Sequence, residues 1–149
     1  MGPHDRIPGP EDWRGYGSDR HLRRAREMFF GKSIDDVRDL FGADAIGLAQ
    51  ALRHMPRGAF RYYVLAFAAY LLSRPARGNA DAASTFLGLL VDREVLDPGS
   101  VVEVYEDLSK AVEFVGSHQE HFGAEPAIYG SFRDRADTLV GICAGTARS

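Results

Sequence analysis

The chain has 149 residues, of which 45% are hydrophobic and 26% are charged, and its formal net charge at pH 7 is −3. These values are typical of one globular domain, and they exclude a disordered chain, a fibrous chain and a uniformly basic nucleic-acid-binding protein. The single cysteine, Cys143, excludes an intramolecular disulfide and a cysteine-based zinc site.

Residues 1–17 are rich in glycine and proline, so we expect an irregular N-terminal arm there rather than a helix or a strand. Trp13 and Tyr16 are expected to hold this arm against the body of the protein, because aromatic rings gain most from burial. The arm lacks the apolar segment of a signal peptide, and the most apolar stretch, 62–72, is too short to span a bilayer. We therefore expect a cytoplasmic protein that does not associate with membranes.

From residue 18 onward, apolar side chains recur at intervals of three and four residues, which predicts amphipathic helices. Each predicted helix opens at a side chain that can accept a hydrogen bond from the first turn. These expected N-caps are Ser18 or Asp19, Ser33, Asp44, Asp81, Asp97 and Ser131. The expected helix ends are Gly31, Gly42, Met55-Pro56 and Gly123. The apolar residues expected to face the core include Phe29, Leu40, Ile46, Phe86, Val95 and Val140.

Two predicted helices differ from the others. Segment 59–73 is apolar almost all the way round, which predicts a helix at the centre of a bundle. After Asp97-Pro98, apolar residues continue at helical spacing to residue 122, which predicts one helix of about 25 residues. No segment alternates apolar and polar residues as a half-buried strand does. We therefore predict an all-α fold: a single-domain helical bundle of six or seven helices over residues 18–149, with no substantial sheet.

Charge is distributed unevenly along the chain. Residues 41–78 include five arginines and one aspartate, whereas residues 79–128 include ten acidic and two basic residues. Glu103, Glu106 and Glu113 lie off the apolar stripe of the predicted long helix and form an acidic face there. This face is either a solvated surface or a docking surface for a basic partner protein.

Arg61 opens the otherwise apolar central helix, beside Tyr62. Its guanidinium forms either a buried ion pair with Asp107 or Glu103, or an anion-binding site with a tyrosine hydroxyl. A nucleic-acid surface is not predicted, because the arginines of this region lie on different elements: Arg53, Arg57, Arg61, Arg74 and Arg77.

His118 and His121 are three residues apart, so they point to the same side of the predicted long helix. A metal site would need Glu120 or Glu125 as a third ligand, and the segment His-Gln-Glu-His does not match the spacing of HEXXH. An interaction of the histidines with the helix dipole is the simpler interpretation. We therefore expect no metal and no cofactor.

The sequence contains no motif of a catalytic nucleophile or of a phosphate-binding loop. Cys143 lies on the predicted apolar face of the last helix, where a small thiol is usually buried. We therefore expect that the protein is not an enzyme.

Four segments resemble a group of uncharacterised small bacterial proteins: Phe30-Gly31-Lys32-Ser33, Met55-Pro56 with Ala59-Phe60-Arg61-Tyr62-Tyr63, Gln119-Glu120-His121-Phe122-Gly123, and Ile128-Tyr129-Gly130-Ser131-Phe132. The Phe-Arg-Tyr-Tyr element is similar to domains of unknown function found among bacterial accessory genes, some of them near polymorphic-toxin loci. The resemblance covers residues 28–132, implies a small helical bacterial protein and suggests an immunity or accessory role. It implies no active-site residue, because the shared motifs concern packing and turns.

Two hypotheses about function follow. The first is a non-enzymatic, cytoplasmic protein-binding domain, most concretely an immunity-type (toxin-neutralising) protein. Its expected partner-binding residues are Glu103, Glu106, Glu113, Arg61, Tyr105 and Trp13. The alternative is a helical bundle that binds a small ligand or a metal through Arg61, Tyr62, His118 and His121. A homodimer is a third interpretation, because an apolar central segment can also lie at a two-fold interface.

Overall fold

Helices form throughout the chain where apolar side chains recur at helical spacing. The computed structural model describes residues 6–13 and 20–148, except for the side chains at 21, 22 and 148, and within these ranges it contains no strand. Six of the described helices have ten or more residues: α1 (Arg20–Phe29), α3 (Phe41–His54), α4 (Arg57–Leu71), α5 (Ala80–Leu96), α6 (Tyr105–Ser117) and α8 (Phe132–Arg148). The shorter elements are α2 (Ile34–Arg38), α7 (Pro126–Tyr129) and the 3-10 turns η2 (Pro10–Trp13), η3 (Arg74–Ala76), η4 (Val102–Val104) and η5 (Gln119–Phe122). The predicted all-α helical bundle is confirmed.

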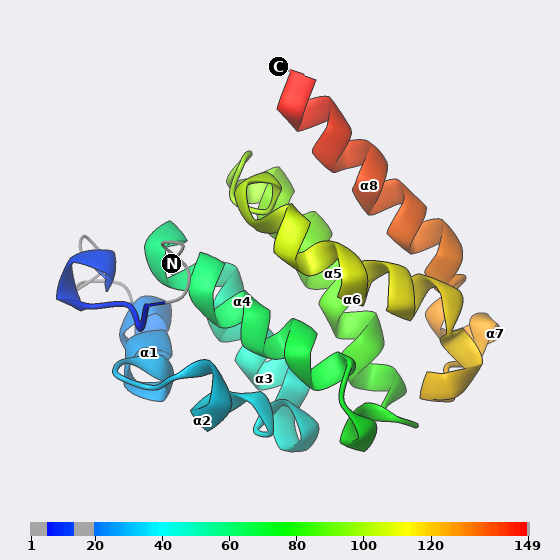
Figure 1. Cartoon of the computed structure of the whole chain (residues 1–149), viewed down its shortest axis with the longest axis horizontal. Coiled ribbons are helices and arrows are strands. Elements are labelled where there is room, and N and C mark those ends of the chain that lie inside the picture. The colour runs from blue at the N-terminus through cyan, green and yellow to red at the C-terminus, as the bar shows by residue number, and fades with distance from the viewer. Residues whose placement is uncertain (1–5, 14–19, 149) are drawn as a thin grey trace.

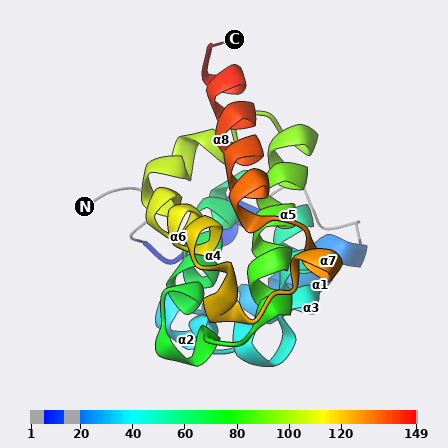
Figure 2. The same cartoon turned by 90° about the vertical axis from the view of Figure 1, so that its right-hand side faces the viewer.

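Helix α4 is the centre of the bundle, as its apolar sequence predicts. It packs against α2, α3, α5 and α6, and α3 lies between α1 and α5 (Figure 1). Helix α8 lies against α5 and α6, and its C-terminal end extends beyond its neighbours in both views (Figures 1 and 2). Among the described residues, no helix is both long enough and apolar enough to cross a membrane.

Three tyrosine hydroxyls on α4 bind the loops at its two ends. The Tyr63 hydroxyl lies 2.7 Å from the carbonyl oxygens of both Phe29 and Lys32. The neighbouring Tyr62 hydroxyl accepts a hydrogen bond of 3.1 Å from the backbone N–H of Ile34. These contacts fix the connection between α1 and α2, because a buried polar group strongly favours a hydrogen-bonded arrangement.

Tyr70 has the equivalent role at the other end of α4. Its hydroxyl accepts a hydrogen bond of 2.9 Å from the side-chain amide of Asn79. Asn79, rather than the predicted Asp81, is the N-cap of α5, since its side chain accepts from the N–H of Ala82 at 3.1 Å. The prediction was wrong by two residues because three consecutive polar or small positions offer alternative caps.

Several helix boundaries follow the predicted local chemistry. Ser33 and Asp36 form a capping box at the start of α2, and the Ser131 hydroxyl accepts from the N–H of Asp134 at the start of α8. Asp44 accepts from the N–H of Gly47 at 2.9 Å, and its non-helical φ of −151° and ψ of 67° mark a kink within α3, so the predicted helix start at Asp44 is confirmed. The preceding short segment continues to this kink rather than ending at Gly42. The predicted caps Ser18 and Asp19, and Tyr16 of the arm, lie outside the described residues.

The predicted helix of about 25 residues after Asp97 is wrong. Asp97 ends α5, the chain turns through residues 98–101, and the following α-helix, α6, is only 13 residues long. Gly99 has a φ of +98°, a left-handed conformation that interrupts a helix. The apolar spacing of the segment is helical, but its backbone direction changes because nearby side chains bind the turn.

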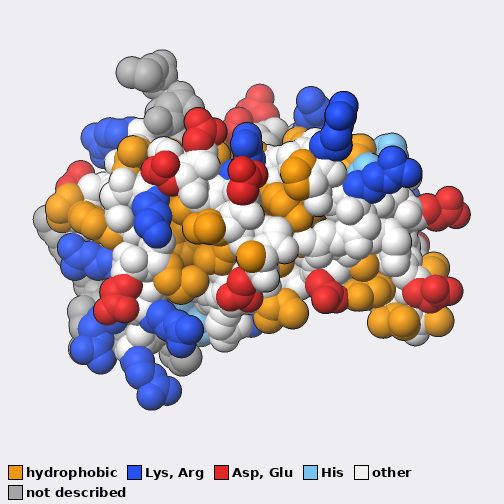
Figure 3. Space-filling view, turned by 90° about the horizontal axis from the view of Figure 1, so that it is seen from below, with side chains coloured by type: hydrophobic (Ala, Val, Ile, Leu, Met, Phe, Trp, Pro, Cys, Tyr) orange, Lys and Arg blue, Asp and Glu red, His pale blue; other side chains and the backbone are white. Residues whose placement is uncertain are grey.

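The predicted core is confirmed at Phe29 and Phe86, whereas four aliphatic residues expected inside are exposed. These residues are Leu40, Ile46, Val95 and Val140. The charged surface is also uneven, with Lys and Arg side chains gathered at the end of the molecule that contains α1 (Figure 3). The described surface therefore carries both exposed aliphatic groups and clustered basic side chains.

We predict that Tyr63→Phe lowers the free energy of unfolding by about 1–2 kcal/mol, because two carbonyl groups at a buried site lose their hydrogen-bond donor. Urea denaturation followed by circular dichroism measures this change. Tyr129→Phe is the matched control, since the Tyr129 hydroxyl donates to Asp81 at an exposed position. An unchanged urea midpoint for Tyr63→Phe would contradict the proposed fixing of the α1–α2 connection.

Candidate functional site

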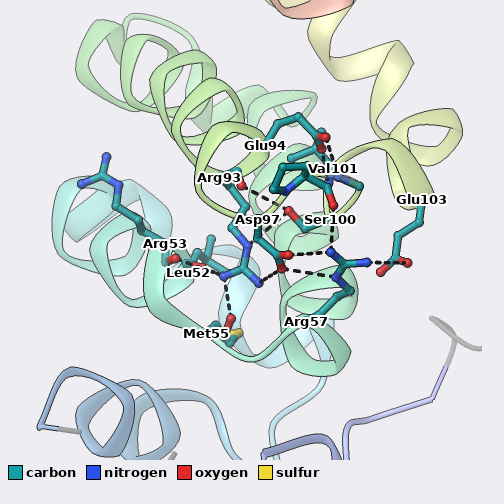
Figure 4. Close-up of polar contacts among 12 residues, drawn as sticks. Leu52, Arg53, Met55, Arg57, Arg93, Glu94, Asp97, Ser100, Val101 and Glu103 are labelled. Carbon is teal, nitrogen blue, oxygen red and sulfur yellow. Dashed lines mark hydrogen bonds and ion pairs between the residues drawn. The ribbon is translucent and has the colours of Figure 1, made fainter. Parts of the chain in front are cut away.

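A buried polar network holds the C-terminal end of α5 (Figure 4). Arg93, only 5% exposed, donates through Nη1 to the carbonyl oxygens of Leu52, Arg53 and Met55. These carbonyls belong to the last turn of α3 and the residue after it, where no further helical N–H groups are present to bind them. The guanidinium also lies 4.5 Å from the centre of the Phe60 ring on α4. Arg93 thus joins α3, α4 and α5.

The next residue, Glu94, binds the turn that leads into α6. Its carboxylate is 1% exposed and accepts hydrogen bonds from the backbone N–H groups of Gly99, Val101 and Val102. The negative charge therefore lies at the beginning of η4, where backbone N–H groups are otherwise unsatisfied. Two adjacent side chains of opposite charge thus provide hydrogen-bond partners for backbone groups at two helix ends: Arg93 binds the carbonyl groups at the end of α3, and Glu94 binds the N–H groups at the start of η4.

Arg57 extends this network toward the surface. Its Nη2 and Nε atoms donate to the Asp97 carboxylate, Nη2 also donates to the Pro98 carbonyl oxygen at 3.0 Å, and Nη1 lies 3.8 Å from Glu103 (Figure 4). The hydrogen bonds from Arg57 hold the pKa of Asp97 below its usual range. The charged groups are paired with one another, so we interpret the network as a structural framework.

Two exposed aliphatic side chains lie directly beside this framework. Val95 and Leu96, in the last turn of α5, are each 65% exposed. Together with Arg53 and Asp92 they line a shallow hollow of about 300 Å³, and Arg53 binds Asp92 at 2.8 Å. An apolar patch bordered by a polar pair has the general composition of a protein–protein contact region. We refer to Val95 and Leu96 as the α5 patch.

A groove continues along α5 on the side that faces α8. It has a volume of about 270 Å³, and its lining includes Leu87, Gly88 and Val91 of α5 and Thr138 of α8. Arg135 also lines it, but its guanidinium is already bound by the Ser84 hydroxyl and carbonyl groups at 2.8 Å. The groove is therefore mainly an apolar surface that leads to the α5 patch.

The predicted acidic face is partly neutralised within the fold. Glu103 lies beside Arg57, and Glu113 binds Arg133 of α8 with two contacts of 3.0 and 3.2 Å. Glu106 is exposed and has no basic side chain within 4 Å among the described residues. Tyr105 is half-buried against the core, and burial raises the pKa of its hydroxyl. Of the three predicted glutamates, Glu106 is the one whose carboxylate is open to a partner.

Trp13 is inside the protein rather than on its surface. It is 4% exposed, and its ring lies 6.4 Å from that of Phe30 and 6.3 Å from that of Tyr63. The expected docking of the N-terminal arm is confirmed at this residue. The prediction that Trp13 contacts a partner protein is wrong, because its indole ring is buried where it holds the N-terminal arm against the helical bundle.

The alternative ligand site is not assembled. Tyr62 is buried against α2, and Arg61 is half-buried without the predicted ion pair to Glu103, which binds Arg57 instead. His121 lies near the opposite end of α4, where its carbonyl oxygen accepts from the N–H of Gly78 at 3.0 Å. Because α4 and α6 run in the same direction, the histidines are separated from Arg61 by about 15 Å of helix.

The two histidines do come together, around an aromatic ring. The His118 ring stacks on Phe114 with a centroid distance of 4.3 Å, and His121 lies 5.3 Å from the same ring. Within residues 6–13 and 20–148, no group of three or more His, Cys, Asp or Glu side chains is arranged to hold a metal ion. His118 ends α6, so the predicted position of this residue at a helix C-terminus is confirmed.

Cys143 is buried on the inner face of α8, as predicted. Burial, with a smaller contribution from Glu94, raises the pKa of its thiol to about 11. The thiol is therefore protonated at neutral pH, and its geometry does not suit a nucleophile.

Comparisons with known proteins give no relative, since no family model, curated protein or solved structure matches the chain. The described structure offers two kinds of surface feature, an aliphatic patch on a firmly held helix end and patches of unpaired charge.

We predict that Asp97→Asn lowers the melting temperature at pH 7, because the variant loses the charge that Arg57 binds. The pKa of Asp97 is lower in the folded protein than in the unfolded chain, so its stabilising effect is present above a pH of about 4 and is lost as the pH falls below that value. Thermal unfolding from pH 7 to pH 2.5 should show the two proteins converging. A melting-temperature difference that is constant over this range would contradict the ion-pair explanation.

Proposed function

We propose that this protein is a non-enzymatic, cytoplasmic domain that binds another protein through the α5 patch. The observation that carries this proposal is the exposure of Val95 and Leu96 on a helix end that a buried network fixes in place. Full burial of an aliphatic side chain contributes about 1.5–3 kcal/mol, so covering Val95 and Leu96 with a partner favours association. An anchor on a rigid helix also loses little conformational freedom when a partner binds.

The most concrete form of this proposal is an immunity-type protein that neutralises a toxin. The resemblance of the Phe-Arg-Tyr-Tyr element supports this form, and so does the exposed Glu106 carboxylate, which suits a basic partner. A ligand- or metal-binding function has less support, because Arg61 and Tyr62 lie far from His118 and His121.

The α5 patch is tested by the double variant Val95→Ser/Leu96→Ser. The tagged protein, its variant and a control are used to capture partners from cells of the source organism, and mass spectrometry quantifies the bound proteins. We expect the double variant to reduce recovery of one stoichiometric partner at least about tenfold, because the apolar anchor is removed.

Ile128→Ser is the matched control. Ile128 is 75% exposed on α7, so its replacement changes exposed aliphatic surface without touching α5. A partner lost with the double variant but retained with Ile128→Ser supports the proposal. The α5 patch is refuted as the binding site if all three proteins retain the partner, or if the control loses it to the same extent. Light scattering tests a separate outcome: a monodisperse dimer would assign the patch to a second copy of the chain.

Charge is tested separately with Glu106→Lys. Because Glu106 has no ion pair with a described residue, this change should leave the melting temperature nearly unchanged and weaken binding to a basic partner. The salt dependence of the affinity should fall at the same time. Titration calorimetry with the captured partner at low and high salt measures both quantities, and an unaltered affinity would exclude Glu106 from the interface.

A further inference from the structure

Helix α1 has one buried face and one face of arginines. Ala25 and Phe29 are fully buried against the bundle, while the opposite side carries four exposed arginines in seven residues. These arginines are Arg20, Arg23, Arg24 and Arg26. We refer to these four residues as the α1 arginine face.

No arginine of this face has an acidic partner among the described residues. In every ion pair between described residues, the basic residue lies outside α1. By contrast Arg53, Arg57, Arg93 and Arg133 all bind carboxylates of their own chain. Within the described residues, the α1 arginine face is therefore not neutralised by an ion pair, and Arg26 lies 4.7 Å from the centre of the Phe30 ring. Figure 3 shows several Lys and Arg side chains at this end of the molecule and others at the opposite end.

A groove runs directly beside this face, between α1 and α3. It has a volume of about 270 Å³, and Arg24, Ala25 and Met28 form its α1 side. The α3 side consists of Asp44, Gly47, Gln50 and Ala51. The groove thus combines the Arg24 side chain with small and aliphatic groups, together with the polar side chains of Asp44 and Gln50.

We propose that the α1 arginine face and the adjoining groove bind an acidic segment of a partner protein. The segment would place carboxylates on Arg20 and Arg24, which lie one helical turn apart on the side of the groove, and their planar guanidinium groups provide paired donors. An aliphatic side chain of the same segment would enter the groove beside Met28. This proposal does not depend on the function assigned to the α5 patch, since α3 separates α1 from α5.

The composition of the site favours an acidic peptide over a nucleic acid. The arginines occupy a helix of ten residues, about 15 Å long, which reaches only a few phosphates. Asp44 in the groove and the exposed Glu27 on α1 would repel a continuous phosphate backbone, whereas a peptide can place its carboxylates selectively. The negative net charge of the whole protein also opposes binding of a long polyanion.

The test uses a library of random twelve-residue peptides displayed on phage, with a single-stranded DNA oligonucleotide of 20 nucleotides as a competing probe. We expect the purified protein to enrich peptides that combine Asp or Glu with Leu, Ile or Val. Fluorescence anisotropy with the enriched peptide should then show a loss of affinity of about tenfold in Arg20→Ala/Arg24→Ala, and weaker binding at higher salt.

Arg74→Ala/Arg77→Ala is the matched control. It also removes two exposed positive charges, but these lie in the segment after the C-terminal end of α4, outside the proposed site. Peptide affinity close to that of the unmodified protein in this control supports a local site, whereas an equal loss in both double variants overturns it as a general charge effect. Enrichment of basic or purely apolar peptides also overturns the proposal. Tighter binding of the oligonucleotide through the same arginines assigns the face to nucleic acid instead. Val95→Ser/Leu96→Ser should not affect the enriched peptide, which keeps the two proposed surfaces distinguishable.

Discussion

The contact on which the rest of the structure depends is the pair of adjacent charges near the end of α5. Arg93 satisfies the terminal carbonyl groups of α3, and Glu94 satisfies the first N–H groups of the segment that becomes α6. Because buried ions are stable only when their partners are complete, neither residue tolerates a rearrangement of the other helices. The position of four helices at this end of the bundle is thus determined by two neighbouring side chains.

This arrangement has a functional meaning if the α5 patch binds a partner. Val95 and Leu96 follow Arg93 and Glu94 directly in the chain, so the aliphatic side chains project from the most firmly held turn of α5. The α1 arginine face is different, since it lies on a helix that packs with a single buried stripe against α3. The two surfaces differ in chemistry as well, one being aliphatic with a paired border and the other cationic with no carboxylate partner among the described residues.

The fold class, the central position of segment 59–73 and the caps at Ser33, Asp44 and Ser131 could be predicted from the sequence, because periodicity and capping act over a few residues. The turn after Asp97 could not be predicted, because side chains outside it determine its conformation. Arg57 binds it from a distant position in the sequence, and Glu94 binds it from the preceding helix. The exposure of Val95 was also missed, since helical spacing identifies a face but does not show where the neighbouring helix ends. The α1 arginine face does not stand out in the sequence, because acidic residues elsewhere in residues 1–40 balance its charge.

The tyrosines of α4 link the stability of distant loops. Their hydroxyls bind backbone groups in the connection before α2 and hold the amide of Asn79 before α5. Neither loop can open locally without removing a partner from a hydroxyl in the core of the protein. The loop at each end of α4 therefore belongs to the same cooperative unit as the core, and amide hydrogen exchange there is governed by global unfolding rather than by local fraying.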